Sequence, residues 1–315
     1  MHIPDGFLDA KTAVAAGVLS AAGLGVALRQ AHRHLPPRRV PLLGLAAAFV
    51  FAAQMLNFPV AGGTSGHLVG ATLAAVLLGP GAAAIALTAV LIVQCFLFND
   101  GGVTALGANV FNMAILGSFV GYGVYRLVRR FAPGQRGLIL AAAFAGWCST
   151  VVAAISCAGQ LALSGTAPWS VSFPAMAGVH MLIGIGEGAI TALVLLAIVR
   201  VRADLVDDAA PVAATPLTAF IGFGLIAALG LALFVSPFAC QWPDGLERVA
   251  AALGFEHRAV ATPLLPAPIP DYAVPGISSA VAATALAGAI GTVLVFGLSL
   301  LLARVLVPKR AAETD

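Results

Sequence analysis

Charged residues are scarce in this chain: 9% of its 315 residues are Asp, Glu, Lys or Arg, whereas a soluble domain carries about 25%. Hydrophobic residues make up 60% of the sequence instead. This composition predicts a polytopic membrane protein in contact with membrane lipid. No nucleic-acid partner is expected.

Several motifs that would indicate an enzyme or a cofactor site are also missing. The four cysteines have no C-x-x-C spacing, so neither a disulfide framework nor a zinc site is indicated. There is no H-E-x-x-H to support a metalloprotease, and no G-x-x-x-x-G-K-[ST], so we expect no ATP site in this chain. Asp5 and Asp9 stand where a cleaved signal peptide would carry positive charge, so we expect Met1 to be retained.

Nine apolar segments can be recognised against the roughly 20 residues that a membrane-spanning helix needs. They lie near residues 12–31, 41–58, 66–78, 81–98, 104–126, 138–163, 174–199, 216–235 and 277–303. If they alternate across the membrane, 13 of the 16 basic residues fall on one side, which is typical of the cytoplasmic side. We therefore predict an all-α polytopic membrane protein with about nine transmembrane helices, the N-terminus outside and the C-terminus cytoplasmic.

A polar stretch divides the nine segments into seven and two. Residues 204–215, which contain several aspartates, are predicted to form a cytoplasmic linker between a seven-segment transmembrane domain at 1–203 and a two-helix module at 216–315. The module has an exterior loop, residues 236–276, with seven prolines. In this loop Asp244-Gly245-Leu246-Glu247 has the cap-x-x-Glu form of a helix start.

Met1 and His2 can supply three nitrogen donors on consecutive covalent links. The donors are the free α-amine, whose ordinary pKa is about 7.7, the backbone nitrogen of His2 and the His2 imidazole. Fused chelate rings with an ionised amide nitrogen suit a metal that favours square-planar coordination, Ni(II) or Cu(II), with Co(II) possible. The alternative is that His2 is an ordinary residue on a frayed terminus.

His67 can supply a fourth nitrogen. The predicted topology puts residues 59–66 outside, and His67 follows a glycine-rich stretch at the start of the short third segment. We predict that His67 completes the site with Met1 and His2. Because the metal needs a neutral imidazole, binding should weaken as the pH falls through about 6.5. The alternative is a histidine that is hydrogen-bonded in a helix start.

Four polar residues inside the apolar segments are candidates for supporting roles. Asn109 and Asn112 lie one turn apart on one predicted helix face, where they could hydrogen-bond metal ligands or, equally, hold helices together. His180 and Glu187 share a face of the seventh segment, and a carboxylate deep in a span is functional by default. For this pair we prefer a buried polar contact that fixes helix packing.

These motifs carry a resemblance to a known family. Met1–Phe7, Gly63–His67 and Leu106–Met113 resemble the CbiM/NikM family, the substrate-specificity (S) components of cobalt and nickel energy-coupling-factor (ECF) transporters, which are ABC transporters. This resemblance covers about residues 1–200. Residues 216–307, with Pro243–Glu247, resemble the small N component (CbiN/NikN) of the same transporters, here fused to the S component.

The resemblance implies a multi-pass protein of the cell inner membrane that is not an enzyme. In the family, the N-terminal amine, the amide and imidazole of the second residue and the histidine matching His67 bind the metal in a square plane. The implied substrate is Ni²⁺ or Co²⁺, and the implied partners are a coupling transmembrane (T) component and ATPase (A) subunits. The Irving–Williams order favours nickel slightly, whereas neighbouring genes of cobalamin biosynthesis would favour cobalt.

An enzyme is the competing interpretation. Gly63–Gly66 also fits the G-x-S-G motif of rhomboid intramembrane serine proteases, with Ser65 as the nucleophile and His180 as its base. The motif is short for a chain with 35 glycines, and it leaves the N-terminal motif unexplained. We therefore predict a transport protein.

Overall fold

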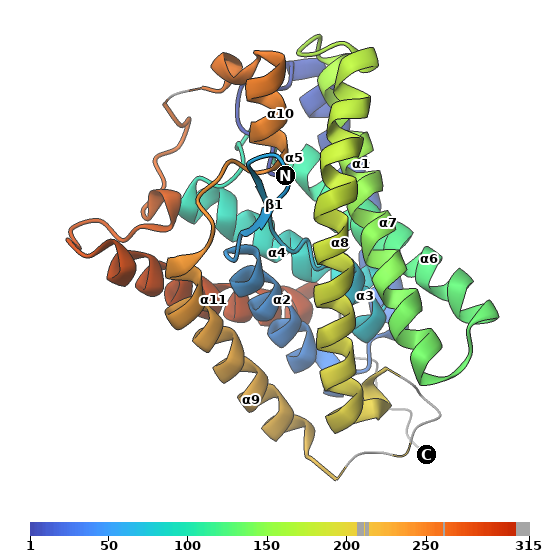
Figure 1. The fold of residues 1–315 in the computed structure, drawn as a ribbon. Helices are drawn as coiled ribbons and strands as arrows, with labels where there is room; N and C mark the ends of the chain where they lie inside the picture. Colours follow the sequence, from blue (N-terminus) through green and yellow to red (C-terminus); the bar gives the residue numbers. More distant parts are fainter. Residues whose placement is uncertain (207–210, 212–213, 261, 307–315) are drawn as a thin grey trace.

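The computed structural model describes residues 1–206, 211, 214–260 and 262–306, and nearly all of its regular structure is helical (Figure 1). This confirms the all-α prediction. The helices and strands are α1 (Ala10–His34), α2 (Val40–Gln54), β1 (Phe58–Val60), β2 (Thr64–Gly66), α3 (Ala71–Leu78), α4 (Pro80–Phe98), α5 (Leu106–Asn109), α6 (Gly117–Phe131), α7 (Gly134–Leu163), α8 (Trp169–Arg202), α9 (Leu217–Gly230), α10 (Gly245–Leu253) and α11 (Ala280–Leu306).

Local capping chemistry sets where two of these helices begin. At the start of α1, Asp9 accepts a hydrogen bond of 2.9 Å from the backbone N–H of Thr12. At α10 the Asp244 carboxylate accepts from the Glu247 N–H, and the Glu247 carboxylate accepts from the Asp244 N–H. The helix start predicted at Asp244 is therefore confirmed.

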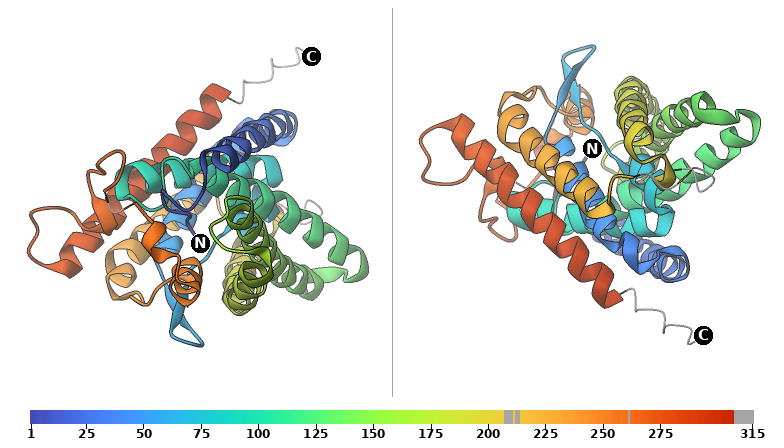
Figure 2. Two further views of the ribbon diagram at one scale, coloured as in Figure 1. Left: turned by 90° about the horizontal axis from the view of Figure 1, so that it is seen from above. Right: turned by 90° about the horizontal axis from the view of Figure 1, so that it is seen from below.

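Helix α4 lies at the centre of the bundle. In its most apolar 18-residue stretch 83% of the residues are buried, against 17% in α1. Helices α1, α2, α3 and α11 pack against α4, while α7 and α8 form a long antiparallel pair beyond α3 (Figures 1 and 2). Helix α9 packs on α2, so both C-terminal helices lie against the N-terminal part of the chain.

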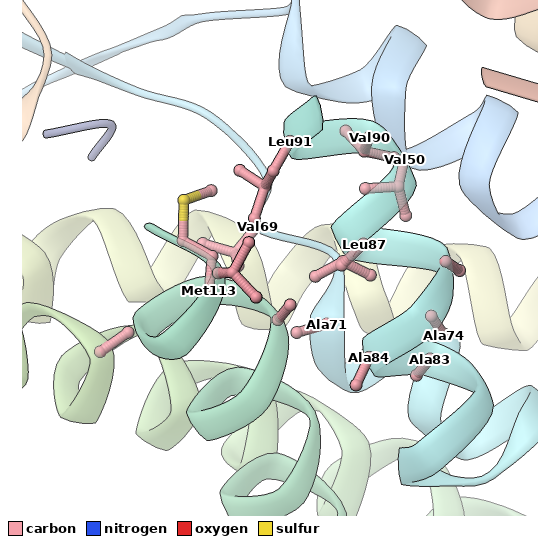
Figure 3. Packing of buried hydrophobic residues seen from close by; sticks show 14 of the residues in the cluster. Val50, Val69, Ala71, Ala74, Ala83, Ala84, Leu87, Val90, Leu91 and Met113 are labelled. Atoms are coloured by element: carbon pink, nitrogen blue, oxygen red, sulfur yellow. The ribbon is translucent and has the colours of Figure 1, made fainter. Parts of the chain in front are cut away.

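Small side chains allow α3 and α4 to pack closely. Figure 3 shows the alanines of both helices facing one another, with larger side chains from neighbouring elements closing the gaps. Ala71 and Ala74 of α3 and Ala83 and Ala84 of α4 are fully or almost fully buried. Within a membrane, lipid is as apolar as leucine, so close packing of small residues is a main source of helix association.

The start of the third apolar segment differs from the prediction. Residues 64–66 form strand β2, which pairs with β1, and His67 lies in the extended stretch before α3 begins at Ala71. The prediction that His67 opens a helix is wrong, because Gly70 takes φ +77° and two backbone N–H groups before α3 bind a side chain of α8. An apolar run this short does not distinguish strand from helix.

Six of the described helices are long and apolar enough to cross a membrane: α1, α4, α7, α8, α9 and α11 with the short turns that extend them. This confirms a polytopic membrane protein. Helix α2 has 15 residues and α3 has 8, and α6 continues from α5 through a π-helical stretch, Val110–Leu116. The count of nine spans and their orientation stay predictions. Residues 207–210 and 212–213 of the predicted linker lie outside the described residues.

The predicted orientation can be measured by cysteine labelling. In a background without native cysteines, Pro37→Cys, beside Arg38 between α1 and α2, should react with a membrane-impermeant maleimide only after the cells are permeabilised. Ala61→Cys, in the exposed turn of the β1–β2 hairpin, is the matched control and should react in intact cells. Labelling of Pro37→Cys in intact cells would overturn the assignment.

Candidate metal centre

The N-terminal amine lies beside His67, 66 residues away in the sequence. The Met1 nitrogen is 3.0 Å from His67 Nε2, and Met1 is only 4% exposed. The rings of His2 and His67 stack, with 5.4 Å between their centroids and 18° between their planes. The structure thus brings together the three residues that the sequence nominated as metal ligands.

The segment from Gly102 to Asn109 holds the N-terminus in this place. The Asn109 amide hydrogen-bonds both backbone groups of Ile3, at 2.8 Å and 3.1 Å. The Asp5 carboxylate accepts from the backbone N–H groups of Val103 and Thr104. A Cβ on Gly102 would come within 2.2 Å of the Asp5 nitrogen, so this approach requires glycine.

His67 presents the correct nitrogen to the amine. Its Nδ1–H lies 3.1 Å from the Leu68 carbonyl oxygen, which leaves the Nε2 lone pair facing Met1. Burial lowers the pKa of His67 below its ordinary value of 6.5, and the neighbouring amine and His2 lower it further. Protons should therefore compete at this ring only below the pH of about 6.5 expected for an ordinary histidine.

Glu187 fixes the backbone that follows His67. Its carboxylate accepts hydrogen bonds from the backbone N–H groups of Val69 at 2.5 Å and Gly70 at 2.9 Å, and its side chain is fully buried. These bonds fix the chain two residues after His67 and tie the start of α3 to α8. The partners of the Glu187 carboxylate are therefore these two N–H groups. The sequence suggested His180 as its partner instead.

The structure does not bring Asn112 or His180 into contact with the three nitrogen donors. Asn112 hydrogen-bonds Gln160 and Ser156 on α7. The π-helical stretch that starts after Asn109 widens the turn, so two asparagines three positions apart face different neighbours. His180 Nδ1–H donates to the Met176 carbonyl at 2.8 Å, and within the described residues its Nε2 has no hydrogen-bond partner.

The serine–histidine dyad of the competing protease interpretation is not formed. Ser65 Oγ donates to the Trp242 carbonyl at 2.7 Å, and the Ser65 N–H donates to the Pro243 carbonyl at 2.8 Å. Ser65 thus joins the β1–β2 hairpin to the loop at residues 236–276, which is called the C-terminal loop below. His180 packs beside Gly245, where an added Cβ would lie 2.7 Å from its ring.

The sequence did not nominate three further polar groups around the site. Asp244, which the sequence showed only as a helix cap, forms a salt bridge with the Met1 ammonium, with 2.6 Å between Asp244 Oδ2 and the Met1 nitrogen. Burial raises the pKa of Asp244, but the Met1 ammonium and the hydrogen bond from the Glu247 N–H together lower it below its ordinary value. Asp100 Oδ1 lies 3.1 Å from His2 Nδ1, and Gln94 Oε1 lies 3.2 Å from His2 Nε2. Of these three residues, only Gln94 could have been found from the sequence, because it is the one side-chain amide in a very apolar helix.

The donor set decides which ions the site can hold. Among the described residues, no three His, Cys, Asp or Glu side chains converge in a metal-binding arrangement. A site at this position would therefore draw on main-chain nitrogen as well as imidazole. Nitrogen donors suit first-row transition metals such as nickel, cobalt and copper, whereas calcium and magnesium prefer oxygen. In this multi-pass helical membrane protein, the cluster therefore has the donor chemistry of a transition-metal site rather than of a calcium or magnesium site.

Comparison with known proteins supplies the family. The chain belongs to the CbiM family, described as the cobalt uptake substrate-specific transmembrane region, which matches residues 2–205. A PDGLE domain matches residues 218–308. These matches confirm the resemblance found in the sequence.

Relatives cover the whole chain as well as its parts. It is 41% identical to a putative fused nickel transport protein NikMN of Archaeoglobus fulgidus, over 96% of this chain and 98% of that protein. It is 33% identical to the fused nickel transport protein NikMN of Rhodobacter capsulatus, over 94% and 95%. The chain is also 38% identical to a truncated transition metal transporter whose crystal structure is known. This match has a TM-score of 0.58 and covers 64% of this chain and 99% of that one.

Proposed function

We propose that this chain is the substrate-binding component of an ATP-driven uptake transporter for Ni²⁺ or Co²⁺. One observation carries the proposal: the Met1 nitrogen lies 3.0 Å from His67 Nε2, with the His2 ring stacked on the His67 ring. Family membership and relatives that are nickel transport proteins support it.

The proposed ligands are the Met1 amine, the backbone nitrogen and imidazole of His2, and the imidazole of His67. An amine can bind a metal only through its lone pair, so the ammonium must lose a proton and its salt bridge with Asp244 must open. Metal capture is thus an exchange in which the cation replaces two protons, one from the Met1 ammonium and one from the His2 amide, beside Asp244 and Asp100. Both carboxylates lie close enough to compensate the charge of the cation.

Planar nitrogen coordination favours nickel over cobalt in this proposal, since affinity rises from Co²⁺ to Ni²⁺ in the Irving–Williams order. The chain would work with a coupling transmembrane (T) component and ATPase (A) subunits in the cell inner membrane, because its sequence contains no Walker-type phosphate-binding motif. The proposed division of labour assigns metal binding to residues 1–203 and control of loading to the fused module at 216–315.

The test is accumulation of radioactive ⁶³Ni²⁺ in cells that lack their own nickel uptake. The chain should support uptake only together with its T and A partners. Truncation after Val206 should leave equilibrium binding by the purified protein within about tenfold of the intact chain and reduce uptake strongly, because the module supplies no ligand.

Asp244→Asn in the full chain is the matched control for the truncation. It removes the charge that faces the amine but keeps the module in place. Uptake by the chain without ATPase subunits would contradict the transport proposal. A truncated protein that folds but binds no metal would show that the module supplies a ligand.

A further inference from the structure

A polar cavity of about 610 Å³ lies at the end of α4 that is remote from the metal centre. Gly81 in the first turn of α4 lines the cavity, whereas Gln94 near the other end of this helix contacts His2. With a rise of about 1.5 Å per residue, these two positions are about 20 Å apart along the helix. The cavity is therefore a feature separate from the proposed metal site.

Arginine side chains from two parts of the chain surround this cavity. Arg39 comes from the short turn between α1 and α2, and Arg126 and Arg129 lie three positions apart on one face of α6. The nearby Asp204 carboxylate is bound by Arg202 at 2.7 Å. None of the described residues that line the cavity is acidic, so this lining carries three formal positive charges and no negative one.

Contacts within the chain hold the two arginines of α6 in place. Arg129 Nη1 donates to the carbonyl oxygens of Ala132 and Gly134, both at 2.8 Å. The guanidinium carbon of Arg126 lies 6.0 Å from the centroid of the Tyr122 ring, which is a cation–π distance. Neither contact involves a carboxylate, so both positive charges stay available to an anion from outside the chain.

The start of α4 brings main-chain donors to the same cavity. Gly81 and Ala82 line it, and the first N–H groups of a helix have no partner within that helix. Their partial positive charge favours an anion at this place. A Cβ on Gly81 would lie 2.5 Å from the Ala27 carbonyl oxygen, so the backbone of α1 packs directly on this helix start. Helices α1, α4 and α6 thus meet around the cavity.

The surface beside the cavity indicates that the anion is amphipathic. Leu19, Val26 and Gln30 follow one another at spacings of seven and four, so they share one face of α1. Gln30 lines the cavity, while Leu19 and Val26 are 52% and 59% exposed. In a membrane such an exposed apolar face is covered by lipid tails. A ligand with an anionic group in the cavity and hydrocarbon along α1 has the chemistry of a phospholipid.

We propose that this cavity binds the phosphate of an anionic phospholipid such as phosphatidylglycerol. Basic pockets between membrane helices on the cytoplasmic side are typical sites for anionic headgroups, and the predicted orientation places the cavity on that side. The bound lipid joins α1, α4 and α6 at the end of α4 that is remote from the metal centre. This proposal does not depend on the proposed transport of nickel or cobalt.

The test is lipid binding by the purified full chain, measured by native mass spectrometry. Phosphatidylglycerol should bind more tightly than phosphatidylcholine with the same acyl chains, and added salt should weaken its binding. Arg126→Gln should weaken phosphatidylglycerol binding about fivefold and the double variant Arg126→Gln, Arg129→Gln about 25-fold, since each basic residue near an anionic lipid contributes about a factor of five. Arg126→Lys keeps the charge and should retain most of the affinity. Phosphatidylcholine binding should not change in any of these variants.

Arg130→Gln is the matched control, because Arg130 is exposed on the same helix but does not line the cavity. It should keep wild-type affinity for phosphatidylglycerol. An equal loss in Arg130→Gln would mean a general attraction of anionic lipid to this end of the protein and would refute a defined site. Nickel affinity should be unchanged in Arg126→Gln, because the cavity and the metal centre are separate.

Four other outcomes would overturn the proposal. Equal wild-type affinity for the two lipids, or an unchanged affinity for phosphatidylglycerol in the double variant, would show that the cavity does not bind a lipid phosphate. Inorganic phosphate that binds as tightly as phosphatidylglycerol would identify a site for the free anion. Lipid binding that begins only after Asp207→Asn and Asp208→Asn would mean that the linker carboxylates are the preferred partners of these arginines. If Arg126→Gln abolishes association with the T component but keeps phosphatidylglycerol binding, the partner is a protein.

Discussion

Adding a single residue before Met1 is expected to lower nickel affinity by more than about 100-fold, because removing even an indirect partner of a metal ligand costs 10- to 100-fold. The extension converts the amine into an amide, which is a much poorer donor. It also has no space, since Met1 is 4% exposed and its nitrogen already contacts His67 and Asp244. Acetylation of the amine should have the same effect.

The measurement is calorimetry with Ni²⁺ on protein carrying a removable N-terminal extension. Cleavage by a protease that leaves Met1 as the first residue should restore affinity and serves as the internal control. An extension at the C-terminus is the second control and should have no effect, because it leaves the Met1 amine unchanged. Tight nickel binding by the uncleaved protein would rule out the amine as a ligand.

Replacing His67 with alanine is expected to lower affinity for both Ni²⁺ and Co²⁺ by about 100-fold or more, since the remaining chelate lacks its fourth nitrogen. The absorption band of a planar nickel site should also be lost. His67 is 8% exposed, and its Nε2 lies 3.0 Å from the Met1 nitrogen.

Two histidines provide controls for this prediction. His257→Ala, in the exposed part of the C-terminal loop, should keep wild-type affinity. His180→Ala should have a small effect, because His180 packs on Gly245 beside Asp244 but does not contact the donors. Wild-type affinity in His67→Ala would refute the proposed ligand set, and an equal loss in His180→Ala would show that His180 reaches the metal or holds the pocket together.

The position of the N-terminus illustrates what was and was not predictable. Met1, His2 and His67 could be nominated because their donor chemistry and the side of the membrane are both properties of the sequence. The salt bridge between Asp244 and Met1 could not be predicted, because 243 residues separate them and only the packing of α10 and the preceding loop on α8 and β2 brings them together. From the sequence alone, Asp244 can be recognised only as the N-cap of a helix.

The sequence by itself determined the helical membrane fold, the cap of α10 and the type of donor atoms, because hydropathy, capping and ligand chemistry act locally. Tertiary structure alone decided that residues 64–66 form a strand, since their pairing with β1 is a contact between segments. The tertiary structure also turned Asn112 away from the site, through a π-helical stretch that no local sequence pattern predicted. Most of all, it brought Gln94 to the His2 ring, because residues 92 positions apart in the sequence meet only when their segments are packed together.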